Sequence, residues 1–442
     1  MKRFLKIHKH TLRENTLISL IFIMSLYNKW LLLLAIILSV LLLKRGILGV
    51  IQLIYLYTTR NLMISFFDTS DSAYDLTYAI YILIYVIGIF FLIRHIKRWV
   101  RSYLIFTFAL ASITLMLIYI IMSLITSNDP LYSITKLINY FIPLIIIVTL
   151  VYLIKEVDEL IKWLANQVVT FILFTLIPLV MSLIKVLSQE QSFKGFFNDS
   201  NTFAVFLILG LLTLIISSMK YHKFNFFVMF VMMSGIFELY VTHSKLAWFV
   251  FIVCLFLSLL LLILKKRYKY LTIPLIISII ILSIFQPSIH YLIKSFVLNG
   301  NSVKSVLMPK DNQIKNIENV LETHMLMGNG FGMSLHGLTK NSDIVAGNMV
   351  FELMMFTGVI GLTCYVIYVL KVMLLATYMF KLTFVLFIAT LLTNTIEIVM
   401  FNAINIGALC YILWGIYLKN GLHKDSKNKM VKKSLEVDKR NI

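Results

Sequence analysis

Four ionisable side chains in the C-terminal part of the chain are suited to general acid–base chemistry: His324, His336, Glu352 and Glu397. An imidazole or a carboxylate can take the proton from an attacking hydroxyl when the two groups are within hydrogen-bonding distance. Glu352 lies one turn inside a long apolar run, where an ionisable group is a functional candidate by default. Glu397 stands among asparagines, so it is equally interpreted as part of a polar cluster between helices. The sequence leaves open which of the four is the base.

A cation near these residues has a position that favours anion binding. Lys310 follows Pro309, which suits the first turn of a helix, and Gly328 suits its end. Apolar residues at helical spacing between them predict an amphipathic helix: Ile314, Ile317, Leu321 and Met325. At about 100° per residue, Lys310 and His324 fall on the apolar side of this helix. A buried cation is costly unless it meets an anion; in the alternative interpretation Lys310 snorkels to water and His324 packs against a neighbouring helix.

Composition identifies the elements that must position these residues. Hydrophobic residues make up 60% of the chain, charged residues only 14%, and the mean hydropathy is +0.91. A soluble domain is only about half apolar, so we expect an all-α, polytopic integral membrane protein. In lipid the backbone must satisfy its own hydrogen bonds, which makes the long apolar runs helices. The polar stretch 287–345 interrupts these runs and is expected to form one large external loop that contains the amphipathic helix.

Apolar runs of spanning length predict fourteen transmembrane helices. Twelve or thirteen remain open, because the three short runs before residue 60 also fit two spans and a re-entrant piece. The expected spans are 15–28, 30–43, 46–59, 76–93, 103–126, 134–154, 164–186, 202–219, 224–241, 245–264, 270–286, 346–370, 379–396 and 398–418. The chain is thus expected to divide into an N-terminal bundle (1–286), the large loop (287–345), C-terminal helices (346–418) and a basic tail (419–442).

The positive charge has a distribution typical of membrane topology. The formal net charge is +20, and its basic residues lie mainly in short connections and in the tail. Basic connections remain in the cytoplasm, which predicts that both termini are cytoplasmic and that the large loop is extracytoplasmic. This distribution does not favour nucleic-acid binding. The cysteines Cys254, Cys364 and Cys410 all fall in expected spans, and no Cys/His spacing is typical of a zinc site.

A set of residues occurs in an informative order. Asn348 opens an apolar run and is followed, after nine residues, by Gly358-Val359-Ile360-Gly361; Lys310, His324 and the glycines at 328, 330 and 332 precede it. This order resembles the bacterial O-antigen polymerase and O-antigen ligase family, in which a loop Arg, a His, a glycine turn, His-Asn and Gly-x-x-Gly follow one another. Two shorter matches are 199–204 and 242–245. Gly347 stands where the family has His before Asn, and this departure favours the polymerase branch over the ligase branch.

The resemblance implies glycosyl transfer on the outer face of the cytoplasmic membrane of a bacterium. A polysaccharide carried on undecaprenyl diphosphate would be moved onto a newly exported, lipid-linked repeat unit. In such a site Lys310 would contact the diphosphate, with Lys245 and Arg60 as further cations, and Asn348 and Asp343 would bind sugar hydroxyls. Lys245 and Arg60 also have an ordinary interpretation as topology-setting charges. Neither a metal nor a cofactor is required if a lysine or arginine supplies the charge.

The expected partners are lipid-linked oligosaccharides, membrane lipids, and a chain-length regulator and a flippase of the same pathway. One alternative function is a lipid-linked oligosaccharide flippase or transporter, which would be expected to show paired repeats and intramembrane charges in corresponding halves. The sequence shows neither. The other alternative is an O-antigen ligase. The sugars, the linkage, its stereochemistry and the oligomeric state do not follow from the sequence.

Overall fold

The computed structural model is helical throughout its described part, with no strand among the described residues. It describes residues 16–26, 28–63, 71–187, 192–221, 225–264, 325–331, 349–376, 381–394, 400 and 406–420. Residues 16–24 are helical, and the N-terminal part continues with α2 (Lys29–Leu43), α3 (Ile47–Asn61), α4 (Asp71–Arg94), α5 (Ile96–Val100), α6 (Tyr103–Thr126), α7 (Pro130–Leu153), α8 (Val157–Leu187), α9 (Ser200–Tyr221), α10 (Phe226–Val241) and α11 (Lys245–Leu264). The C-terminal part contains α15 (Met349–Leu375), α16 (Leu382–Thr393) and α17 (Gly407–Asn420).

Local sequence explains where several helices begin. The Asn28 side chain accepts a hydrogen bond from the Trp30 backbone N–H at 2.8 Å and caps α2. Asp129 caps α7 in the same way, at 3.0 Å from the Tyr132 nitrogen, and Pro130 occupies the first helical position. Gly46, at a φ of 67°, closes the turn between α2 and α3.

Six of the described helices are long and apolar enough to cross a membrane: α6, α7, most of α8, α9, most of α11 and α15. Four further apolar stretches are shorter, within α2, α4, α10 and α16. The helical, multi-pass membrane architecture expected from composition is therefore confirmed for the described part of the chain. The full count of twelve to fourteen spans stays a prediction, since the expected span 270–286 lies outside the described residues.

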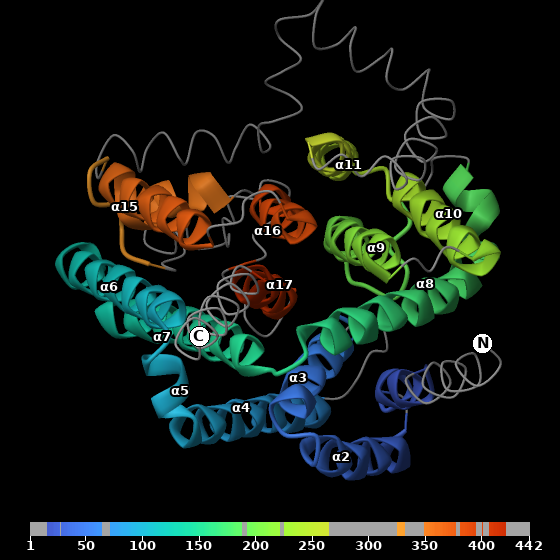
Figure 1. Cartoon of the computed structure of the whole chain (residues 1–442), viewed down its shortest axis with the longest axis horizontal. Coiled ribbons are helices and arrows are strands. Elements are labelled where there is room, and N and C mark those ends of the chain that lie inside the picture. Colours follow the sequence, from blue (N-terminus) through green and yellow to red (C-terminus); the bar gives the residue numbers. More distant parts are fainter. Residues whose placement is uncertain are drawn as a thin grey trace, which may run out of the picture.

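Helix α17 is the centre of the packing (Figure 1). It lies between α7 and α16 and is buried along its whole length, apart from the half-buried Lys419. Trp414 donates a hydrogen bond from Nε1 to Thr390 Oγ1 on α16 at 2.7 Å, and its ring lies 4.9 Å from that of Phe387. Tyr411 contacts Tyr140 of α7, with ring centroids 6.0 Å apart. Figure 1 shows α2, α3 and α4 along one edge of this centre and α15, α16 and α11 along the other.

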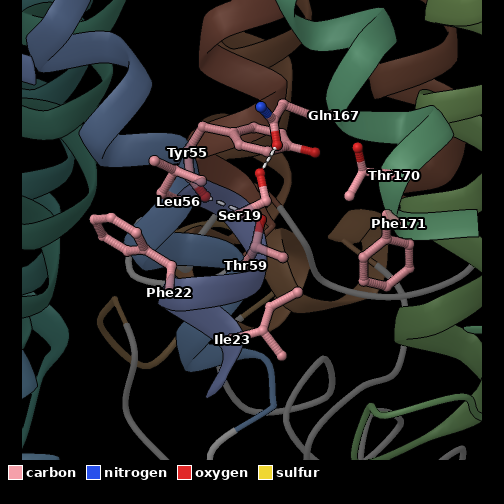
Figure 2. Close-up of a pocket in the computed structure, with 9 residues that line it drawn as sticks. All are labelled: Ser19, Phe22, Ile23, Tyr55, Leu56, Thr59, Gln167, Thr170 and Phe171. Carbon is pink, nitrogen blue, oxygen red and sulfur yellow. Dashed lines mark hydrogen bonds between the residues drawn. The ribbon is translucent and has the colours of Figure 1, made fainter. Parts of the chain in front are cut away.

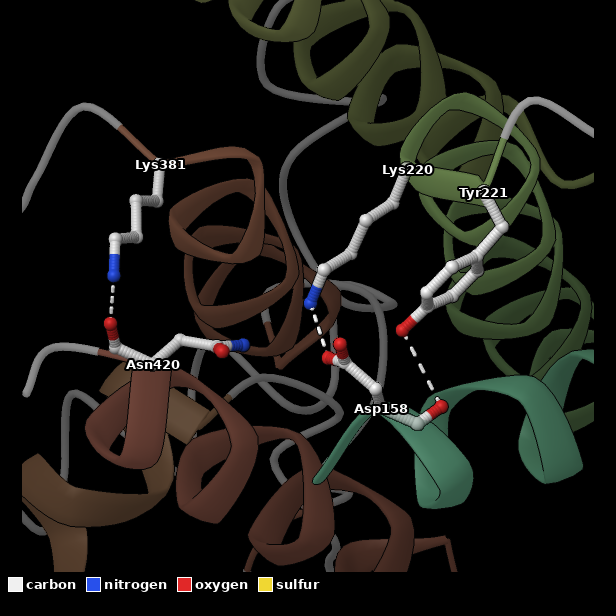
Figure 3. Close-up of polar contacts among 5 residues, drawn as sticks. All are labelled: Asp158, Lys220, Tyr221, Lys381 and Asn420. Atoms are coloured by element: carbon white, nitrogen blue, oxygen red, sulfur yellow. Dashed lines mark hydrogen bonds and ion pairs between the residues drawn. The ribbon is translucent and has the colours of Figure 1, made fainter. Parts of the chain in front are cut away.

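One end of the bundle, here called the basic face, collects the basic connections. It comprises the start of α3, the ends of α4, α7, α9 and α17, the start of α8, and α5. Lys220 at the end of α9 forms an ion pair with Asp158 at the start of α8, 2.5 Å apart, and Lys381 before α16 donates to the backbone oxygen of Asn420 (Figure 3). Lys419 lies 5.0 Å from the centre of the Tyr152 ring at the end of α7. These contacts place the basic ends of distant helices side by side.

Candidate functional site

Helix α15 is broken at Gly358, and the segment Met325–Phe331, here called the inserted segment, fills the break. In a continuous helix the N–H groups of Val359 and Ile360 would bond the carbonyl oxygens of Met355 and Phe356. Here Val359 N donates to Met325 O at 3.0 Å and Ile360 N to Leu326 O at 3.2 Å.

The two carbonyl oxygens that the break leaves without helix partners also bond to the inserted segment. The backbone N–H of Asn329 donates to Met355 O at 2.9 Å, and that of Gly330 donates to Phe356 O at 3.0 Å. The break removes two hydrogen bonds within α15. The two N–H donors and the two carbonyl acceptors of those bonds all bond to the inserted segment instead. Irregular backbone inside a membrane protein is tolerated where protein buries and satisfies it.

Glycines make this insertion sterically possible. Gly358 has a φ of 60° and a ψ of −166°, a conformation that essentially only glycine adopts. A Cβ at Gly358 would lie 2.3 Å from the Leu326 carbonyl oxygen, and one at Gly328 would lie 2.5 Å from the Phe356 carbonyl carbon. Two backbones therefore approach more closely than side chains allow. The backbone that approaches Gly358 is that of the inserted segment.

Phe331 anchors the end of the inserted segment in the bundle. Its backbone N–H donates to Ser123 Oγ on α6 at 3.0 Å, and its side chain is 3% exposed. Its ring is stacked on Tyr119 at 5.8 Å and on Tyr140 at 6.4 Å between ring centroids. Such aromatic pairs contribute about 0.5–1.5 kcal/mol each beyond burial.

The sequence predicted a helix end at Gly328, and Gly328 does adopt a φ of 68°. Met325 was expected on the buried side of that helix, but it is 59% exposed.

Glu352 lies in the first turn of α15, at the end of the bundle opposite the basic face. Its Oε2 is buried and has no hydrogen-bond partner among the described residues. The carboxyl group of Glu352 interacts electrostatically with the positive charge of Lys136 on α7. A buried acceptor left without a donor costs roughly 1–3 kcal/mol. The catalytic role of Glu352 stays a prediction, and its unbonded oxygen makes the carboxyl group a candidate to be tested.

Asn394 joins the start of α15 to the end of α16. Its backbone oxygen accepts from Met349 N at 3.1 Å, and its Oδ1 accepts from Met400 N at 2.8 Å. Its side chain is buried and also donates to Thr390 O. Asn394 thus has a structural role and fixes the entry to α15 next to Glu352.

Arg60 ends α3 on the side away from the basic face. Its side chain is 1% exposed, and Nε donates to Ser25 Oγ at 2.9 Å. The preceding residue, Thr59, lines a cavity of about 10 Å³ between α3, α8 and the helical residues 16–24, where Ser19 donates to Gln167 Oε1 (Figure 2). This volume holds at most about one water molecule. The burial of Arg60 favours a structural cation over a direct lipid contact.

The remaining expected site residues are placed only in part. Lys245 begins α11, beside His243, which has a φ of 56°. The residues His324, His336, Lys310, Asn348, Asp343 and Glu397 lie outside the described residues. The structure thus locates Met325–Phe331 of the long loop and Glu352, and the proposed roles stay predictions.

Sequence reasoning missed a buried carboxyl group on α10. Glu238 is fully buried; its Oε1 accepts from Thr175 Oγ1 of α8 at 2.8 Å, and its Oε2 has no partner in the described part of the chain. The available signal was a single acidic residue in the apolar run 226–241, which is expensive in a membrane. The inserted segment was missed for another reason, since no local pattern encodes a backbone hydrogen bond to a distant helix.

No protein-family model matches this chain, and no curated protein is significantly similar to it. Among the described residues, no group of three His, Cys, Asp or Glu side chains is arranged to hold a metal ion. The described part of the structure is that of a helical, multi-pass membrane protein with a broken helix, an inserted segment, a fully buried Glu238 and a half-buried Glu352.

Proposed function

We propose that this chain is a membrane glycosyltransferase that polymerises lipid-linked repeat units of a surface polysaccharide. Basic connections remain on the cytoplasmic side of bacterial membranes, so the basic face would contact the cytoplasm. Glu352, the inserted segment and the long loop would then face the outside. This orientation places the site where exported, undecaprenyl-diphosphate-linked units become available.

The single observation that supports this proposal most strongly is the seating of Met325–Phe331 in α15. It fixes part of the long loop against α15 near Glu352, because the break at Gly358 lies less than two turns further along the same helix. The glycines that permit the insertion, Gly328 and Gly358, are those that match the glycine turn and the Gly-x-x-Gly of the family described above. A rigid mounting of this kind is what a glycosyl transfer site built on a loop needs.

The proposed reaction is a displacement at the anomeric carbon of the growing polymer. A hydroxyl oxygen of the acceptor repeat unit forms a bond to that carbon, and the bond to the lipid diphosphate breaks. Glu352 takes the hydroxyl proton, and the departing diphosphate carries the electron pair. A cation must stabilise that charge, and Lys310 is the residue proposed for this role.

A transporter is the second candidate, because broken helices often build ion and substrate sites in transporters. In those proteins the free helix ends face the ligand. Here the two N–H groups and two carbonyl oxygens freed at Gly358 are all bonded to the inserted segment. The break is therefore occupied by protein, which favours the transferase. A ligase is less favoured because Gly347 replaces the histidine of that branch.

Deletion of the gene distinguishes these functions. Loss of a polymerase should leave the final acceptor, for example lipid A-core, carrying a single repeat unit. Loss of a ligase would leave bare acceptor with polymer on the lipid carrier, and loss of a flippase would trap units on the cytoplasmic leaflet. Gel profiles of the surface glycan, together with an assay for units on each leaflet, decide among the three; bare acceptor would exclude the polymerase.

A further inference from the structure

Four helix ends surround a cavity of about 510 Å³ on the basic face. They are the start of α3, the end of α4, the end of α7 and the start of α8. The inserted segment lies at the opposite end of the bundle, where it contacts the end of α6 and the first part of α15. The cavity is also separate from the Lys220–Asp158 ion pair, which does not line it.

Cations from three connections line this cavity. Arg45 comes from the turn before α3, Arg94 from the last turn of α4, and Lys155 from the link between α7 and α8. His95 adds a fourth nitrogen-bearing side chain. The carboxylates Glu156 and Glu159 also line the space, so any ligand must meet them. No ion pair joins either carboxylate to these cations within the described chain. The three permanent cations outnumber the carboxylates.

The wall of the cavity is apolar where it extends into the bundle. It is lined by the side chains of Ile47, Leu48, Phe91, Leu153 and Ile154. The first turn of α3 also lines the cavity. Its N-cap residue, Gly46, provides no side-chain acceptor for the backbone N–H groups of that turn. A cationic rim above an apolar wall suits a ligand that carries both a phosphate and a hydrocarbon part.

We propose that this cavity binds the phosphate headgroup of an anionic phospholipid. Arg45, Arg94 and Lys155 contact the phosphate, and the acyl chains lie against the apolar wall. The general positive charge of the basic face does not account for such a site, because Lys97 and Arg101 share that face without lining the cavity. A free phosphate compound has the same charged chemistry but gains nothing from the apolar wall.

Native mass spectrometry of the full-length protein in a neutral detergent tests the proposal. Phosphatidylglycerol should remain bound to the wild type, and phosphatidylcholine should not. The double variant Arg45→Ala/Arg94→Ala should reduce phosphatidylglycerol retention by roughly tenfold or more, since each cation near an anionic lipid contributes about fivefold. The double variant Lys97→Ala/Arg101→Ala removes the same charge from the same face and should retain the lipid.

Three results would overturn the proposal. The first is equal retention of phosphatidylglycerol by the two double variants. The second is equal retention of phosphatidylcholine and phosphatidylglycerol by the wild type. The third is displacement of the lipid by inorganic phosphate but not by chloride at the same ionic strength, which would identify a site for a small soluble phosphate.

Discussion

Glu352 is the residue whose environment most directly suits chemistry. It lies in the first turn of α15. Its Oε2 is buried and accepts no hydrogen bond from the part of the chain that the structure describes, and its carboxyl group interacts electrostatically with Lys136. A carboxyl group that serves only packing would be expected to have its oxygens bonded. The free acceptor at Glu352 is therefore available to a substrate hydroxyl.

We expect Glu352→Gln to lower polymer formation by about 10²- to 10⁴-fold, the usual contribution of a general base. Glutamine keeps the shape of the side chain, so the amount of protein in the membrane should not change. The measurement is the glycan ladder of cells that carry the variant, alongside its level by immunoblot. Glu159→Gln, an exposed carboxylate on the basic face, is the matched control and should leave the ladder intact. A normal ladder from Glu352→Gln would remove this residue from the reaction.

Glu238 leads to a prediction about stability. A neutral glutamine retains an acceptor for Thr175 Oγ1 and avoids any cost of burying a charge. Glu238→Ala removes the hydrogen bond from Thr175 Oγ1 and opens a cavity, which should cost about 2–4 kcal/mol in the free energy of unfolding. Thermal unfolding in detergent should therefore give Glu238→Gln a Tm near that of the wild type and Glu238→Ala a clearly lower one. Equal losses from both variants would show that the carboxyl group itself is needed.

At the scale of elements, α15 can be compared in two forms: a continuous helix, and the observed broken helix that bonds the inserted segment. The continuous form of α15 would regain two internal hydrogen bonds, whereas the broken form holds four bonds to the inserted segment. Glycine at 358 permits the broken form because its φ of 60° costs it little. Replacing this glycine should therefore shift the balance towards the continuous helix.

We expect Gly358→Ala to displace the inserted segment, because an alanine there carries roughly 1–3 kcal/mol of backbone strain and a clash with Leu326 O. Ser123→Cys reports the displacement, since Ser123 is buried beneath Phe331. In a background lacking the native cysteines, this thiol should be protected from a water-soluble reagent and become reactive when Gly358→Ala is added. Gly210→Ala, a helical glycine whose new methyl meets only side-chain atoms of Val168 at 3.2 Å, should leave it protected. Unchanged protection with Gly358→Ala would contradict a glycine-dependent insertion.

The sequence predicted the positions of most elements because apolar runs in a membrane leave few alternatives to helix. The expected spans 103–126 and 245–264 coincide with α6 and α11, and 346–370 differs from α15 by only a few residues. The last span, expected at 398–418, begins later, as α17 at Gly407. The side chain of Asn394 bonds Met400 N in the connection before it.

The candidate site was less predictable for a physical reason. Glu352 was recognisable because a charge in an apolar run is costly wherever the helix packs. The contacts of Phe331 with Ser123 and of Gly328 with Phe356 depend on three segments meeting in space. The glycines at 328 and 358 are visible in the sequence, but the sequence does not encode which backbone approaches them.

At the scale of the whole molecule, the two ends of the bundle differ in charge. Arg45, Arg94, Lys155, Lys220 and Lys419 come together at the basic face, although they are widely separated in the sequence. The opposite end holds the inserted segment and Glu352. Helices that alternate in direction bring every second connection to the same face. The basic residues of separate connections therefore gather on one surface, which the rule for basic connections assigns to the cytoplasm. One orientation in the membrane then determines the side of every connection.

Thiol labelling of single cysteines tests this orientation. In a background without the native cysteines, Asn128→Cys lies in the exposed connection between α6 and α7 at the end opposite the basic face, and Lys97→Cys lies on exposed α5. We expect a membrane-impermeant reagent to label Asn128→Cys in intact spheroplasts and Lys97→Cys only after the membrane is permeabilised, because the positive face remains inside. Cysteines at Ser302 and Ser342 in the long loop should behave like the first, and one at Ser426 in the basic tail like the second. The reverse pattern would place Glu352 on the cytoplasmic side, where exported lipid-linked units are not found, and the polymerase proposal would fail with it.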